Sequence, residues 1–186
     1  MEVLILLFVV VFLLPIVFVF AQYNGMVGLR NHIRDAWANI DTELKRRHDL
    51  IPNLVATVKG YAAHEREVLQ QVVELRNRCL NHQQPVATLA SEESQLTAAL
   101  QRLMVVVENY PQLKADQNFL QLQQELVNTE DRIQSARRFY NGNVRDYRNR
   151  VQYFPGNLVA KMFGFGLEEY FDAEPEARNN PQIRLD

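Results

Sequence analysis

Residues 116–154 read DQNFLQLQQELVNTEDRIQSARRFYNGNVRDYRNRVQYF, and the apolar residues in this stretch recur every three or four positions. This period places them on one face of an α-helix, whereas a β-strand would alternate them every second position. Asp116 is a candidate N-cap, and Pro155 with Gly156 is expected to end the helix. A stripe of this length packs against neighbouring helices in near-antiparallel bundles. Its members are Phe119, Leu122, Leu126, Thr129, Ile133, Ala136, Tyr140, Val144, Tyr147, Val151 and Phe154.

A second stripe with the same period runs through residues 33–75. It keeps its phase across Pro52, which predicts either a kink or a helix that restarts there with Asp49 as its N-cap. Another helix is expected from Ser91 to about Asn109, because an acidic pair follows the serine and a proline closes the segment. The sequence therefore predicts an all-α fold, an antiparallel bundle of long helices.

An apolar run, Val3–Ala21, precedes the bundle and contains no charged residue. At about 1.5 Å per residue, a helix of this length just crosses a hydrocarbon core of about 30 Å. Pro15 is tolerated in a spanning helix and is expected to kink it rather than end it. A cleaved signal peptide is the alternative, but it would need a basic region ahead of the run and a shorter apolar core. We therefore expect a retained membrane anchor over residues 1–22 and a helical bundle over residues 23–157.

The basic residues indicate an orientation for this anchor. None precedes the apolar run, whereas Arg30 and Arg34 follow it closely and residues 45–47 add three more. Positive residues near a span favour the cytoplasmic side of the membrane. We therefore expect the N-terminus outside the cell and the body in the cytoplasm.

Residues 158–186 differ in character from the bundle. Their first part is a short aromatic and apolar segment, and their last part is polar and acidic. The aromatic segment either folds back over an open end of the bundle or exposes an apolar patch that meets membrane or another subunit. The sequence leaves both interpretations open.

No pattern in the sequence meets the requirements of a catalytic or metal site. His64 and Glu65 begin a zinc-protease motif, but Val68 stands where the second histidine is needed. Cys79 and His82 have a spacing that suits one metal ion, yet two ligands are too few. We therefore expect no enzymatic activity, no cofactor and no metal.

Basic and aromatic residues form a candidate interaction surface. The basic ones are either solvated faces, or contacts to anionic lipid headgroups or to an acidic patch on a neighbouring copy. For the basic residues beside Pro52, at positions 45–47, a further interpretation is that their ion pairs fix a kink in the helix at the proline. Nucleic acid is not expected as a partner, because the chain has a net charge of -2 and a membrane anchor. The candidates are Lys45, Arg46, Arg47, Arg145, Arg148, Arg150, Phe163, Phe165, Tyr170 and Phe171.

Residues 27–65 read VGLRNHIRDAWANIDTELKRRHDLIPNLVATVKGYAAHE, which closely resembles the opening signature of the LemA family of bacterial membrane proteins. Residues 108–115 (ENYPQLKA) and 126–137 (LVNTEDRIQSAR) extend the resemblance to most of the chain after the anchor. The resemblance implies a single N-terminal span in the bacterial cell membrane, an antiparallel helical bundle and no established enzymatic activity.

The sequence thus favours a membrane-anchored scaffold or interaction protein that assembles into a homo-oligomer. The alternatives are a protein that binds or shapes the lipid surface, and an adaptor for another membrane protein. A transporter or membrane enzyme is disfavoured, because the single span carries no ionisable residue.

Overall fold

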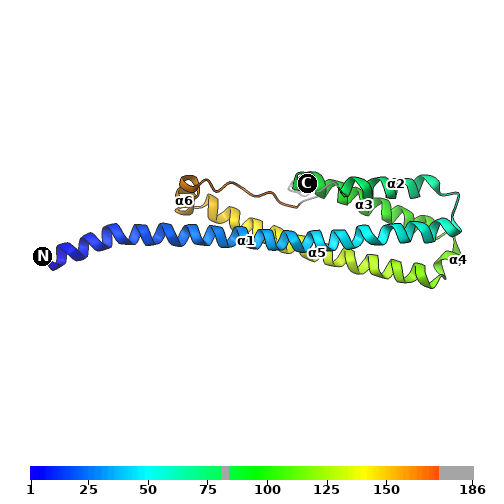
Figure 1. The fold of residues 1–186 in the computed structure, drawn as a ribbon, viewed down its shortest axis with the longest axis horizontal. Helices are drawn as coiled ribbons and strands as arrows, with labels where there is room; N and C mark the ends of the chain where they lie inside the picture. Colours follow the sequence, from blue (N-terminus) through cyan, green and yellow to red (C-terminus); the bar gives the residue numbers. More distant parts are fainter. Residues whose placement is uncertain (81–83, 172–186) are drawn as a thin grey trace, which may run out of the picture. The chain divides into compact units, whose positions relative to one another are not determined.

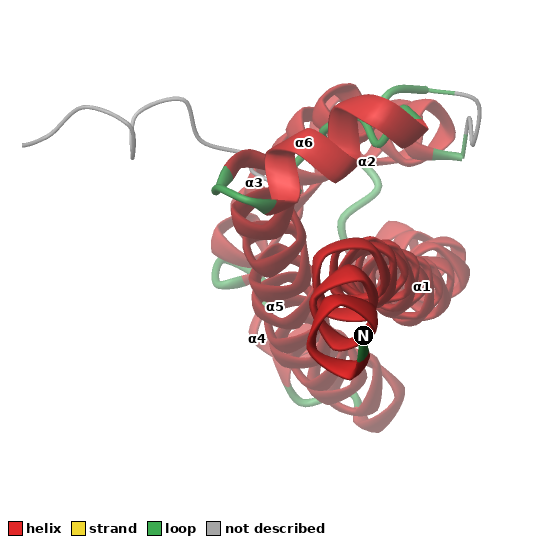
Figure 2. Cartoon of the chain, turned by 90° about the vertical axis from the view of Figure 1, so that its left-hand side faces the viewer, coloured by secondary structure: helices red, strands yellow, loops and turns green. Residues whose placement is uncertain are grey.

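The computed structural model describes residues 1–80 and 84–171, apart from the side chains of residues 3–9 and 11. Figure 2 shows that this part of the chain consists of helices and loops, without a strand, which confirms the predicted all-α fold. The helices are α1 (Glu2–Tyr61), α2 (Arg66–Cys79), α3 (Val86–Val107), α4 (Pro111–Lys114), α5 (Gln117–Gln152) and α6 (Gly156–Phe163), labelled in Figure 1.

The two long helices, α1 and α5, each contribute to two compact units. Unit 1 contains residues 1–39 and 138–169, and unit 2 contains residues 40–137 together with Tyr170 and Phe171.

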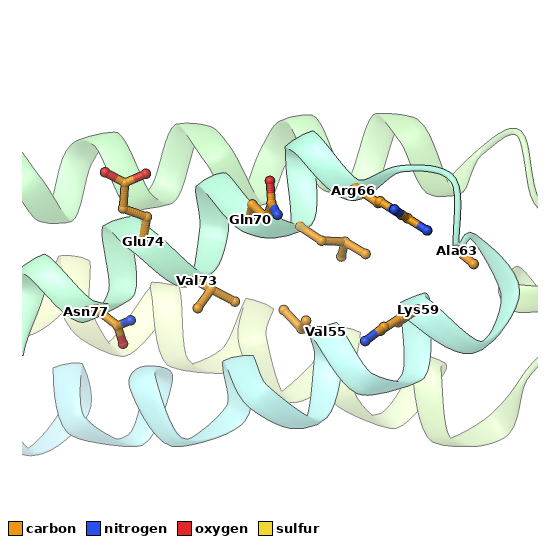
Figure 3. A pocket seen from close by; sticks show the side chains of 9 residues that line it. Val55, Lys59, Ala63, Arg66, Gln70, Val73, Glu74 and Asn77 are labelled. Atoms are coloured by element: carbon orange, nitrogen blue, oxygen red, sulfur yellow. The ribbon is translucent and has the colours of Figure 1, made fainter.

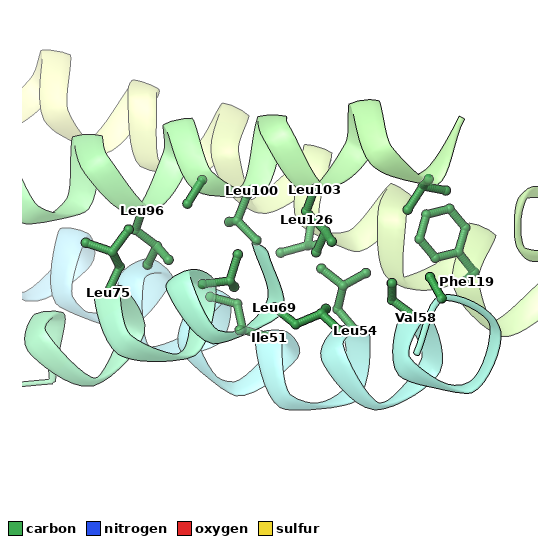
Figure 4. Packing of buried hydrophobic residues seen from close by; sticks show 14 of the residues in the cluster. Ile51, Leu54, Val58, Leu69, Leu75, Leu96, Leu100, Leu103, Phe119 and Leu126 are labelled. Atoms are coloured by element: carbon green, nitrogen blue, oxygen red, sulfur yellow. The ribbon is translucent and has the colours of Figure 1, made fainter. Parts of the chain in front are cut away.

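The core of unit 2 is an apolar cluster to which α1, α2, α3 and α5 contribute (Figure 4). Burying each leucine or isoleucine of this kind contributes roughly 1.5–3 kcal/mol relative to leaving it in water. The helices are therefore held together by the stripes that the sequence predicts. Members labelled in the figure are Ile51, Leu54, Val58, Leu69, Leu75, Leu96, Leu100, Leu103, Phe119 and Leu126.

Two tyrosine–carboxylate hydrogen bonds close one end of unit 2. The Tyr61 hydroxyl donates to Asp116 Oδ2 at 3.0 Å, and the Tyr110 hydroxyl donates to Glu65 Oε1 at 3.0 Å. Asp116 Oδ1 also accepts the backbone N–H of Phe119 at 2.9 Å, which confirms Asp116 as the cap of α5. That backbone hydrogen bond, followed by the one from Tyr61, lowers the pKa of Asp116.

Two predicted helix boundaries are wrong. The third helix begins at Val86, directly after the non-helical Pro85, so Ser91 lies inside α3 rather than ahead of it. The long helix ends at Gln152, so Phe154 lies beyond the stripe and its side chain is 79% exposed. The other predicted members of that stripe, through Val151, are buried or partly buried.

The predicted restart of the helix at Pro52, with Asp49 as its N-cap, is also wrong, because α1 is helical from Glu2 to Tyr61. Proline has no N–H, so Pro52 leaves the carbonyl of His48 without its helical donor. Arg76 supplies a substitute, since its Nε donates to the His48 carbonyl oxygen at 2.7 Å. A side chain of α2 therefore satisfies the group that the proline frees in α1.

In unit 1, α6 packs on the end of α5 and the chain then turns back. Gly164 has φ +70°, and the N–H of Phe165 donates to the Ala160 carbonyl at 2.9 Å, as in a Schellman helix end. The Tyr147 hydroxyl donates to the Gly166 carbonyl and the Tyr140 hydroxyl to the Glu169 carbonyl, both at 2.9 Å. The segment 164–169 therefore folds back antiparallel to α5.

Candidate functional site

The most unusual feature of unit 2 is a group of polar side chains inside its core. Arg47 and His48 of α1 and Glu93 of α3 are buried, with Arg47 only 2% exposed. Charged residues are almost never buried unless they are paired. The contacts of these side chains therefore decide what the cluster does.

Arg47 is the centre of this cluster. Its Nη2 bonds to Glu93 Oε2, and its Nη1 donates to Glu130 Oε2 at 2.7 Å and to Thr97 Oγ1 at 2.9 Å. The other oxygen of Glu93 lies 2.8 Å from Nε2 of His48. The cluster thus joins α1, α3 and α5 through one guanidinium, and both oxygens of Glu93 are engaged.

The surroundings determine the protonation of Glu93 and of the nearby Cys79 thiol. Burial by itself would raise the pKa of Glu93, but the hydrogen bond with His48 and the charge of Arg47 hold it below its ordinary value. Burial raises the pKa of the Cys79 thiol to about 12, and the Glu93 charge adds to the rise. At neutral pH the core therefore holds an ionised carboxylate and a protonated thiol.

His48, Cys79 and Glu93 each offer a metal-ligating atom, and these atoms lie within 4.8 Å of one another. A cation there would have to compete with Arg47 for Glu93 and remove the proton from a thiol whose pKa is about 12. A protonated thiol is also a poor nucleophile. The arrangement therefore suits a structural ion pair rather than a metal site. The other pair of possible metal ligands, Cys79 and His82, cannot be compared with it, because His82 lies outside the described part of the chain.

The depressed pKa of Glu93 predicts how stability depends on pH. Because the folded-state pKa lies below the ordinary value of 4.5, the stabilisation is complete above about pH 4.5 and is lost as the pH falls through the folded value. Glu93→Gln should be less stable than the wild type at neutral pH but should lose less stability over this acid window. Urea midpoints of both chains in detergent micelles test this, and parallel declines would contradict it.

Arg47 does not lie on the predicted interaction surface, because its side chain is buried. Lys45 and Arg46 are exposed, and Arg46 lies 3.6 Å from Glu43. Arg47 instead lies three residues after Leu44 and four before Ile51, on the buried stripe of α1. That phase is the signal in the sequence that separates it from its basic neighbours.

The C-terminal candidates also divide between surface and interior. Phe163 is exposed, and Phe165 is partly buried, whereas Phe171 is only 1% exposed and lies beneath the Arg137 guanidinium, 5.2 Å from its ring centroid. Burial makes Phe171 unsuitable for the surface role predicted for it. Tyr170 is partly buried.

The three arginines of α5 among the predicted interaction residues differ in their contacts. Arg145 is exposed and lies 3.2 Å from Asp146. Arg150 Nε donates to Gln22 Oε1 at 3.1 Å, and Arg148 Nη1 donates to the Glu168 carbonyl at 3.4 Å. All three therefore contact groups of unit 1 itself, and Arg148 and Arg150 reach residues outside α5.

A groove of about 700 Å³ runs between α1 and α2 in unit 2 (Figure 3). Val55 of α1 and Leu69 and Val73 of α2 supply its apolar lining. Lys59, Arg66 and Glu74 add charged groups to the lining.

At the other end of the chain, α1 is long and apolar enough to cross a membrane, and it is the one such helix among the residues that the structure describes. Pro15 and Ala21 lie within it and are exposed, whereas the side chain of Val3 is outside the described part. The continuous helix and its exposed apolar residues agree with the predicted anchor.

A helix able to span a membrane, continuous with an all-α bundle, defines a class of anchored helical-bundle proteins. The chain belongs to the LemA family, whose model matches residues 36–185. This match confirms the resemblance drawn from the sequence.

The curated proteins similar to this chain include one that bears the family name. The chain is 25% identical over 179 residues to magnetosome proteins MamQ 1 and MamQ 2 of Paramagnetospirillum magneticum, an alignment that covers 83% of this chain. The chain spans 66% of the length of these magnetosome proteins. It is also 27% identical over 158 residues to protein LemA of Metamycoplasma hominis, covering 83% of this chain and 72% of that one. None of these names states an enzymatic activity.

Proposed function

We propose that this chain is a non-enzymatic, membrane-anchored scaffold whose bundle assembles with other copies at the bacterial cell membrane. The observation that carries the proposal is the continuity of α1, which supplies both the candidate span and a face of the unit 2 core. The helix that enters the lipid is thus also the helix against which α2, α3 and α5 pack in the core of unit 2. Membrane lipid and further copies are the partners, with another membrane protein as the alternative and a cytoplasmic body as the expected orientation.

Particle mass tests the assembly. The full chain, extracted with its surrounding lipid in a polymer disc, should give uniform particles of many copies by mass photometry. Single-copy particles would overturn the proposal of self-assembly and leave a protein partner, captured by cross-linking, as the occupant of the exposed surfaces.

The groove between α1 and α2 is our candidate for a contact between copies. Val73 lies in it and is 38% exposed, so Val73→Asp should reduce the particle mass without disturbing the core. Val105→Asp, at a position of α3 that is 65% exposed and outside the groove, is the matched control and should leave the mass unchanged. Equal masses for all three chains would exclude the groove as the contact.

A further inference from the structure

The short helix α6 has apolar residues on both of its sides. Val159 and Ala160 are buried against unit 1, and Gly156 starts the helix on the same side. Leu158 and Met162, one turn apart, are 60% and 64% exposed on the opposite side. A helix that only completed a core would present polar residues there, so the exposed row requires its own explanation.

The residues next to this row enlarge the apolar patch. Phe154 precedes Leu158 by four positions, and Tyr153, Phe163 and Leu167 are also at least half exposed. Lys161 is the one basic side chain within α6, and a lysine beside such a patch can extend its ammonium toward lipid headgroups. We name the exposed side chains of residues 153, 154, 158, 162 and 163 the α6 patch.

Contacts within unit 1 place α6 beside the end of the candidate span. The Tyr23 ring packs edge-on against Phe163 and Phe165, with ring centroids 5.0 Å and 5.4 Å apart. Tyr23 follows the last residue of the apolar run, Ala21, by two positions, or about 3 Å along a helix. The α6 patch therefore lies within a turn or so of the level at which α1 leaves the hydrocarbon.

We propose that the α6 patch is a second membrane contact, in which Leu158, Met162 and the neighbouring aromatic rings enter the lipid interface beside α1. Aromatic, leucine and methionine side chains suit this zone, where an interfacial helix buries its apolar face roughly 5–10 Å deep. The inference rests on the membrane anchoring in the proposed function and names a lipid surface as the occupant of the patch. A bilayer is the occupant that continuity with the span favours.

The arginines near the patch already have polar partners within unit 1. The patch should therefore bind lipid by inserting apolar side chains rather than by charge attraction to headgroups. Arg150 donates to Gln22, and Arg30 Nε lies 3.1 Å from Glu168 Oε1. Binding of the patch should therefore depend weakly on anionic lipid. This differs from the sequence-based alternative, in which arginines of α5 meet the headgroups.

Tryptophan quenching by brominated lipid tests the proposal in the full chain. The single Trp37 is first replaced by phenylalanine, and each probe is a separate tryptophan: Leu13→Trp in the span, Met162→Trp in the patch and Val105→Trp on α3. The chains are placed in nanodiscs whose acyl chains carry bromine near the headgroup or near the bilayer centre. Val105 is the matched control, because its exposure of 65% equals that of Met162 within one per cent.

The expected result is strong quenching of Met162→Trp by shallow bromine, strong quenching of Leu13→Trp by deep bromine and no quenching of Val105→Trp. If the span probe is quenched and the patch probe behaves like Val105→Trp, the patch is not a membrane contact although the anchor stands. A patch probe that is unquenched but blue-shifted would assign the patch to a second copy. A span probe without quenching would refute the anchor itself.

A second variant disturbs the close contact between Gly156 of α6 and the end of α5 without changing the residues of the patch. A Cβ on Gly156 would lie 2.2 Å from the backbone oxygen of Arg150, so Gly156→Ala must push α6 away from α5. Adding it to Met162→Trp should reduce the shallow quenching. Gly142→Ala is the matched control, because a Cβ there meets nothing within 4 Å, and it should leave the quenching unchanged. Unchanged quenching with Gly156→Ala would show that the contact between Gly156 and the end of α5 does not position the patch at the membrane.

Discussion

Replacing Arg47 with methionine is expected to lower the free energy of unfolding by about 3–5 kcal/mol, the cost of leaving a buried charge without its partner. The guanidinium bonds to carboxylates on two other helices, and its removal leaves Glu93, which is 4% exposed, as an uncompensated anion. Methionine retains most of the volume of the side chain, so the loss reports the charge rather than a cavity. Urea unfolding of the full chain in micelles, followed by helical circular dichroism, measures it.

Two further variants separate the ion pair from a general effect of removing a basic residue. Lys45→Ala, two positions away and exposed, should change stability by no more than about 0.5 kcal/mol. Adding Glu93→Gln to Arg47→Met should restore much of the lost stability, because no buried anion then remains without a counter-ion. A cost of Arg47→Met below about 1 kcal/mol would mean that the buried ion pair is not what holds these helices together.

The sequence predicts most of the helical architecture because local features determine it. The stripe from Phe119 to Val151 is buried or partly buried as its period requires, and Asp116 caps the helix with its side chain. The turn at residues 62–65 was not predicted, since it contains neither glycine nor proline. The Ala62 N–H still donates to the Val58 carbonyl, so the helical hydrogen bonding continues to Ala62 before the chain turns.

The buried cluster was missed for a different reason. A basic residue is assigned to the surface by default, and the partners of Arg47 lie 46 and 83 residues further along the chain. Only the packing of α1, α3 and α5 brings these groups together. The phase of the stripes nevertheless marks them, since Glu93 lies four residues after Leu89 and three before Leu96 on the buried face of α3.

The α6 patch could be recognised only in part. Its aromatic composition suggested either a fold-back or an exposed surface, and the structure shows both in neighbouring segments. Residues 164–169 fold back along α5, whereas Leu158 and Met162 stay exposed. The division depends on Gly164, whose left-handed backbone reverses the chain after Phe163, and on hydrogen bonds from tyrosines about twenty to thirty residues earlier.

Arg76→Met is expected to cost about 1–3 kcal/mol, because it leaves a partly buried carbonyl without a donor. The carbonyl is that of His48. It lacks its helical hydrogen bond because Pro52 has no N–H, and it accepts one from Arg76 Nε at 2.7 Å instead. Arg76 therefore stabilises the fold through this hydrogen bond only while residue 52 is a proline. Urea unfolding in micelles provides the free energies.

A double-mutant cycle tests that condition. Pro52→Ala restores an N–H that can donate to His48, so Arg76→Met should cost no more than about 0.5 kcal/mol in the alanine background. Pro52 is exposed, so its ring contributes little packing and the alanine should not create a cavity. An equal cost of Arg76→Met in both backgrounds would show that Arg76 acts through other contacts. A cost confined to the proline background would establish that a side chain of α2 compensates for the hydrogen bond that Pro52 removes from α1.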